Sequence, residues 1–146
     1  VKEVAQENYM RGRSQKTPAP APIQPDEIVK QFLSLMQNRK LDEAQKWLAD
    51  GAEMIFPGGK RFTALTEIVT WAKTRYQSVL KTFERVETSF DGQDATVYCH
   101  GTLQGIWLDG SNFDGIRFID RFSISGGKIT NQQVWNDLAE ARGLRR

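Results

Sequence analysis

One carboxylate falls among the apolar positions of a strand-like stretch. In GIRFIDRFSI (residues 115–124) every second position on one face is apolar, and that face holds Ile116, Phe118, Phe122 and Ile124. Asp120 falls on the same face. Flanked by two phenylalanines, its carboxyl group should be desolvated, and its pKa should rise. A carboxyl group that titrates near neutrality suits a general acid or base.

A structural interpretation of Asp120 stays open beside the catalytic one. A buried aspartate can also accept hydrogen bonds from indole N–H groups or helix-end amides, and an unpaired buried acid is costly in either case. Strand alternation sends Arg117 and Arg121 to the opposite face. We therefore expect no basic neighbour to lower the pKa of Asp120.

His100 and Cys99 are the other side chains with catalytic chemistry, and the chain holds one of each type. In ATVYCHGTLQGIW (95–107) the apolar face contains Cys99, so His100 should point to the opposite face. We expect a surface or interface histidine. A β-bulge would reverse that assignment.

The overall composition excludes several classes of function. The formal net charge of the 146 residues is +2, too small to predict nucleic-acid binding. There is no apolar run long enough to span a membrane, no His/Cys/acid cluster with metal-ligand spacing and no phosphate-binding glycine loop. We expect no metal and no cofactor.

The N-terminal segment should have no core of its own. SQKTPAPAPIQP (14–25) contains four of the five prolines and favours extended conformations. We expect residues 1–25 to form a flexible or docked arm and residues 26–146 to form one domain. Because the chain begins with Val1, we expect a fragment or a processed form. The compartment stays unknown, with the cytoplasm favoured.

Three helices are predicted in the first half of the domain. Helical apolar spacing begins at Asp26, a plausible N-cap. A second helix is predicted over 38–50, ended by Gly51. A third should begin at Thr63, with an inner face that includes Ile68, Trp71, Ala72, Tyr76 and Val79.

From about residue 82 the apolar period changes to two, which indicates strands. We expect strands over 81–90, 95–107, 115–124 and 129–136, after a short one near 52–56, and a closing helix capped by Asn136 or Asp137. Helices followed by an antiparallel meander predict an α+β domain, in which a curved, mostly antiparallel sheet wraps around three N-terminal helices as a cone. Such a cone offers a concave site for a small molecule.

The chain resembles the nuclear transport factor 2-like superfamily, and within it the SnoaL-like, polyketide cyclase-like branch. The resemblance covers residues 26–140 and is carried by ADGAEMIFPGG, FTALTEIVTWAKTRY and above all IDRFSISGGKITNQQVWND. It implies the cone fold. The superfamily hosts isomerases, dehydratases, cyclases, epoxide hydrolases and non-enzymatic association domains, so the fold does not select a reaction.

The resemblance also implies a set of cavity residues. An acid two positions before the first phenylalanine of the F-x-[FIV]-x-x-G-K-I pattern can face the cavity, and Asp120 stands there. Gln132 stands where many SnoaL-like proteins have a histidine, a departure that weakens an acid/base relay. The predicted ligand-binding residues are Met54, Trp71, Tyr76, Trp107, Phe118, Gln132 and Asn136.

Two functions remain open. The first is binding of a small hydrophobic molecule, with isomerase, cyclase or dehydratase chemistry in which Asp120 transfers a proton. The second is a non-catalytic dimeric association domain. Apolar residues on the predicted outer sheet face favour a homodimer, and they are Tyr98, Ile106, Leu108 and Ile119.

Overall fold

The structure is a computed structural model that describes residues 21–143. The predicted arm therefore lies outside the described residues except for its last five positions. The elements are α2 (Pro25–Gln37), α3 (Leu41–Gln45), β1 (Leu48–Phe56), β2 (Lys60–Phe62), α4 (Leu65–Ala72), β3 (Tyr76–Asp91), β4 (Asp94–Trp107), β5 (Asn112–Ser125), β6 (Lys128–Asn136) and α5 (Leu138–Gly143).

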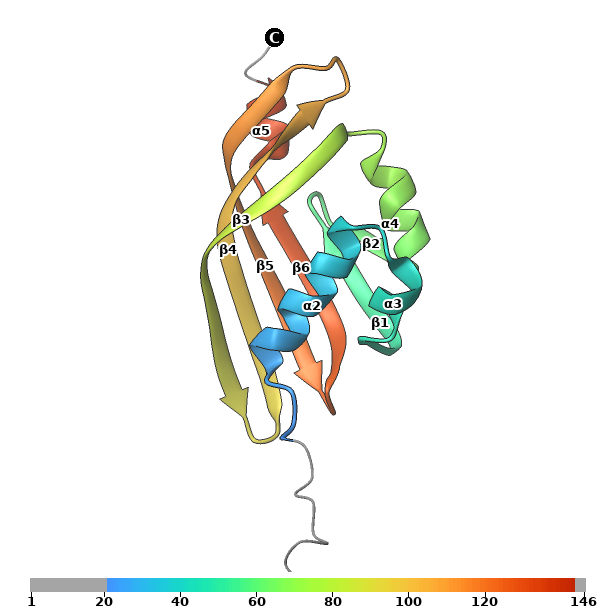
Figure 1. Cartoon of the computed structure of the whole chain (residues 1–146), viewed down its shortest axis with the longest axis vertical. Coiled ribbons are helices and arrows are strands. Elements are labelled where there is room, and N and C mark those ends of the chain that lie inside the picture. Colours follow the sequence, from blue (N-terminus) through green and yellow to red (C-terminus); the bar gives the residue numbers. More distant parts are fainter. Residues whose placement is uncertain (1–20, 144–146) are drawn as a thin grey trace, which may run out of the picture.

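Six strands form one curved sheet in the order β2-β1-β6-β5-β4-β3. All neighbours pair antiparallel except β1 and β6, which run parallel. The helix α2 packs across the concave face against β3, β4 and β6 (Figure 1). The predicted fold, an α+β cone with a mostly antiparallel sheet, is confirmed.

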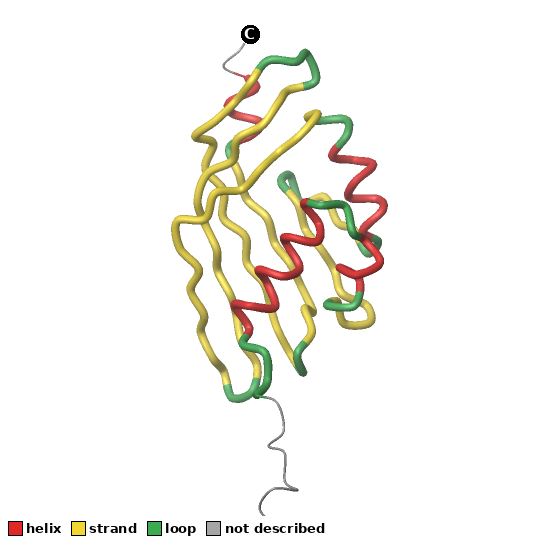
Figure 2. Tube along the Cα trace, viewed as in Figure 1, coloured by secondary structure: helices red, strands yellow, loops and turns green. Residues whose placement is uncertain are grey.

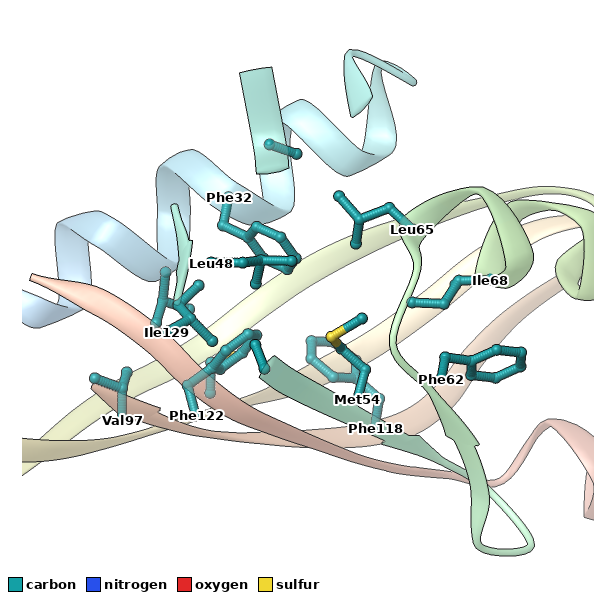
Figure 3. Packing of buried hydrophobic residues seen from close by; sticks show 14 of the residues in the cluster. Phe32, Leu48, Met54, Phe62, Leu65, Ile68, Val97, Phe118, Phe122 and Ile129 are labelled. Carbon is teal, nitrogen blue, oxygen red and sulfur yellow. The ribbon is translucent and has the colours of Figure 1, made fainter. Parts of the chain in front are cut away.

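The core lies between α2 and the concave face of the sheet. Phe32 of α2 meets Phe122 of β5 edge to face, with ring centroids 6.1 Å apart. Met54 and Ile129 are fully buried beside them, and Figure 3 shows these side chains converging from separate elements. Burying each of these side chains contributes about 1.5–3 kcal/mol relative to leaving it exposed.

The predicted helix over 38–50 is wrong in its second half. The helix α3 ends at Gln45, and β1 already begins at Leu48. Gly51 does not end a helix. It lies inside β1 with φ +74°, where the register against β6 shifts between Leu48 and Glu53. The β-bulge there requires a residue that tolerates left-handed φ. Because the bulge interrupts the period-two alternation, the sequence pattern does not indicate a strand here.

The change of period also comes earlier than predicted, because β3 begins at Tyr76 rather than near residue 82. Figure 2 shows this long strand following the α4 helix after a short loop. Its register against β4 shifts between Tyr76 and Ser78. The extra residue lets Tyr76 and Val79 face the same side although they are three positions apart. That spacing is also typical of a helix, which is why the sequence predicts both residues on the preceding helix.

The predicted helix caps are correct at only one end of the domain. Gln24, rather than Asp26, precedes α2, and Ala64 precedes α4, in both cases without a side-chain cap. The last helix begins as predicted, because Asn136 Oδ1 accepts a hydrogen bond from the Leu138 amide at 3.2 Å.

Candidate functional site

Asp120 lies on the concave face of β5, and its side chain has no solvent exposure. Its neighbours across the sheet are Cys99 of β4 and Val134 of β6. The strand phase predicted for Asp120 is therefore confirmed. One carboxylate oxygen, Oδ1, is buried and has no hydrogen-bond partner among residues 21–143.

The expectation that Asp120 has no basic neighbour is wrong. Lys81 of β3 donates from Nζ to Asp120 Oδ2 and forms an ion pair with it. The same ammonium lies 5.0 Å from the centre of the Phe118 ring, a favourable cation–π distance. Strand alternation predicts the outward direction of both β5 arginines correctly. It cannot predict the cation Lys81, because β3 lies two strands away from β5 in the sheet.

The pKa of Asp120 is raised above its ordinary value, mainly because burial desolvates the carboxylate. The charge and hydrogen bond of Lys81 act in the opposite direction without cancelling that effect. Burial likewise raises the pKa of the Cys99 thiol to about 12, so Cys99 is a thiol rather than a nucleophilic thiolate at neutral pH.

A pocket of about 320 Å³ opens between α2 and β3. Its wall is largely apolar, with Phe32, Leu33 and Met36 on one side and Val79 and Phe83 on the other. Further residues of this wall are Tyr76, Lys81 and Gln132. Its volume lies within the range of small-molecule sites. Lys81 thus lines the pocket while its partner Asp120 does not.

The structure brings together only part of the predicted ligand set. Tyr76 and Gln132 line the pocket. Met54 is fully buried in the core, and Trp71 packs against Phe56 with ring centroids 5.5 Å apart. Trp107 lines a separate pocket against α5, which Tyr76 also borders.

The last two predicted ligand-binding residues, Phe118 and Asn136, do not line the α2–β3 pocket. Phe118 is buried beneath Lys81, and Asn136 caps α5. Both border a groove on the outer side of the sheet together with His100. His100 stands 3.7 Å from Glu84 and is partly exposed, on the outer face as predicted.

Arg39 is a pocket residue that the sequence reading missed. Its amide bonds to the Met36 carbonyl at 3.1 Å, and the next amide, that of Lys40, bonds to the Leu35 carbonyl at 2.9 Å. These two bonds form a Schellman motif at the end of α2, in which Arg39 occupies the position that glycine usually fills. Arg39 accordingly has φ +57°, the one positive φ at a non-glycine position in the described range.

Replacing Arg39 by glycine is expected to leave the domain as stable or up to about 1 kcal/mol more stable, because glycine adopts left-handed φ without steric cost. The loss of the exposed bond from Arg39 Nη1 to the Met36 carbonyl offsets part of the gain. Urea unfolding of the two proteins measures the difference. A loss of more than about 1 kcal/mol would show that this arginine serves mainly to cap α2.

The described part of the chain offers no metal site and no membrane span. Between residues 21 and 143 there is no group of three or more His, Cys, Asp or Glu side chains that could hold a metal ion. In the same range, every helix is too short or too polar to cross a bilayer.

Comparison with known proteins relates the chain to others through structure. No family model matches the sequence. No curated protein matches it either. Among solved structures, an NTF2-like protein from Burkholderia thailandensis superimposes with TM-score 0.68 and 16% identity over 85% of this chain and 98% of that one.

Two further structures extend the comparison. TerC, co-crystallised with polyporic acid, has TM-score 0.66 and 16% identity over 83% of this chain and 98% of that one. A protein described as a SnoaL-like polyketide cyclase, from Jannaschia sp. CCS1, has TM-score 0.57 and 16% identity over 86% and 95% of the two chains. The domain therefore has the nuclear transport factor 2-like fold, which it shares with SnoaL-like proteins.

Proposed function

We propose that this domain binds a small hydrophobic molecule in the pocket between α2 and β3. The observation that carries the proposal is an apolar pocket of about 320 Å³ with one side chain of a buried ion pair, Lys81, in its wall. Flat apolar groups fit between the α2 and β3 side chains. The ammonium of Lys81 supplies an oriented donor for one ligand oxygen.

We further propose that the ion pair gives the site its acid/base chemistry. Asp120 is buried and is not among the lining residues, so it would act on a ligand through Lys81. Lys81 would donate a hydrogen bond to a carbonyl oxygen, and Asp120 would hold the ammonium in place. Such polarisation acidifies the adjacent C–H bond, and the proton would pass to solvent water, because the described wall holds no carboxylate or imidazole to accept it.

The structural comparisons support a ligand-binding function. TerC, whose structure was obtained with polyporic acid, has the same fold. The protein described as a SnoaL-like polyketide cyclase belongs to the same structural group. At 16% identity these likenesses concern the fold, so the pocket of this chain has to be tested directly.

Filling the pocket from β3 should abolish ligand binding. We expect wild-type protein to bind 2-naphthamide, a flat neutral probe, in calorimetric titrations, and Val79→Trp to weaken that binding at least about tenfold, since the indole would occupy the ligand volume. Leu80→Trp is the matched control, because Leu80 is exposed and is not a pocket residue. Equal binding by both variants would place the ligand elsewhere.

The outer sheet face favours a second candidate function, that of a dimeric association domain. Ile119 pairs across strands with Trp135 on one side and with His100 on the other. Trp135 is 48% exposed, Tyr98 39% and Ile119 38%. Adjacent exposed apolar side chains of this kind are typical of protein interfaces. Trp135 was absent from the residues predicted for this face.

If this face forms a homodimer, Ile119→Glu should convert dimer into monomer. Sedimentation velocity at micromolar concentration would show the change, because two symmetry-related carboxylates would meet at the interface without partners. Phe90→Ser, at an exposed side chain near the β3–β4 turn, should leave the dimer intact. A wild-type protein that sediments as a monomer would argue against the association function.

A further inference from the structure

The charged side chains around the α2–β3 pocket all carry the same sign. Lys30, Arg39 and Lys81 line it, and its described wall contains no aspartate or glutamate. Lys81 is neutralised by Asp120, and the exposed Lys30 lies 3.6 Å from Asp26. The guanidinium of Arg39 has no carboxylate partner among residues 21–143; it donates to the Met36 carbonyl at 2.8 Å.

The residue at this position of a Schellman motif is usually glycine, because glycine adopts left-handed φ without steric cost. Arg39 has left-handed φ at the glycine position of the Schellman motif. An arginine held there at a conformational cost, with its head group at the pocket, suggests that the side chain is kept for what it contacts.

The phenol of Tyr76 lies in the same electrostatic environment. Burial raises its pKa, and the charges of Lys81 and Arg39 act on it in the opposite direction. The net rise keeps the phenol protonated at neutral pH, so its O–H remains a donor. Tyr76 and Arg39 both line the pocket, and together they offer a phenolic and a guanidinium donor to one oxyanion.

We propose that the ligand is an amphipathic anion, an aromatic carboxylate or a comparable oxyanion, whose charged oxygen binds Arg39 and Tyr76 while its ring system lies between α2 and β3. The inference rests on the proposed function and names its ligand class. The apolar wall accounts for the ring system. The charge is accounted for by the Arg39 guanidinium, which has no carboxylate partner among residues 21–143, and by the absence of acids in the described wall.

The test compares two probes of the same shape, 2-naphthoate and 2-naphthamide, by isothermal titration calorimetry. We expect wild-type protein to bind the carboxylate at least about tenfold more tightly than the amide, as charge-assisted hydrogen bonds allow. In Arg39→Gln the preference should disappear, because the carboxylate loses its charged partner and its affinity falls to that of the amide. Arg61→Gln, an exposed arginine paired with Glu53 and absent from the pocket wall, should keep the preference.

The outcomes separate this inference from the proposed function. If the amide binds, Val79→Trp blocks it and the carboxylate shows no advantage, the pocket binds ligands but the anionic class is wrong. A carboxylate preference that survives in Arg39→Gln would also overturn the inference. If neither probe binds at millimolar concentration, both the inference and the proposed function fail.

Discussion

Replacing Lys81 by methionine is expected to lower the free energy of unfolding by about 3 kcal/mol near neutral pH, because removing one partner of a buried ion pair leaves the other charge uncompensated. Asp120 has no solvent exposure and one oxygen already lacks a partner, so the variant carboxylate would have no hydrogen bond from a described side chain. Urea denaturation followed by circular dichroism measures the loss.

The loss in Lys81→Met should depend on pH. The pKa of Asp120 is raised in the folded protein, so the folded state holds its proton to higher pH than the unfolded state does. Such a group contributes stability at acidic pH, and the contribution is lost as pH rises from the unfolded pKa through the folded one. Without Lys81 the folded pKa rises further. The difference between wild type and variant should therefore shrink on acidification.

The double variant Lys81→Met, Asp120→Leu is the matched control. A buried ion pair replaced as a unit by apolar side chains is often neutral, so the double variant should recover most of the stability lost in the single one. A single variant that loses less than about 0.5 kcal/mol, or a loss independent of pH, would contradict the buried pair described here.

Replacing Gly101 by alanine is expected to cost about 3 kcal/mol, at the upper end of what overpacking costs. A Cβ at Gly101 would lie 1.9 Å from the Thr82 carbonyl oxygen, a backbone atom that cannot move without opening the β3–β4 ladder. The register of β3 shifts between Phe83 and Arg85 beside this position. The close approach lets β3 bend over the concave face (Figure 1).

Gly143→Ala is the control for that substitution, because a Cβ there meets nothing within 4 Å. Thermal melts should show Gly143→Ala unchanged and Gly101→Ala lowered by several degrees or more. Equal melting temperatures for Gly101→Ala and wild type would mean that the two strands do not approach so closely. The same strand segment carries Lys81, so Gly101→Ala should also weaken binding of 2-naphthamide.

The fold could be predicted from the sequence because β4 and β5 alternate with period two over most of their length. The alternation in β5 placed Asp120 inward correctly, and the pattern in β4 placed His100 outward. The errors fall at irregularities. Bulges at Gly51 and after Tyr76 change the period locally, so the sequence predicts helix where the chain forms strand.

The site was less predictable than the fold, because it depends on which residues of distant elements meet. Lys81 reaches Asp120 across 39 positions of sequence, and no local pattern in either strand indicates that contact. Arg39 belongs to no apolar pattern of helical or strand spacing, so the sequence did not indicate its place in the pocket. The lack of glycine after the α2 pattern was the one available clue.

An NMR titration shows whether the α2–β3 pocket is a ligand site. Adding 2-naphthamide, and separately 2-naphthoate, to ¹⁵N-labelled protein should shift the amide signals of Met36, Val79 and Phe83 saturably, since these residues line the pocket. Signals of Ile119 and Trp135 on the outer face should stay in place. Shifts confined to the outer face, or none with either probe at millimolar concentration, would contradict the claim.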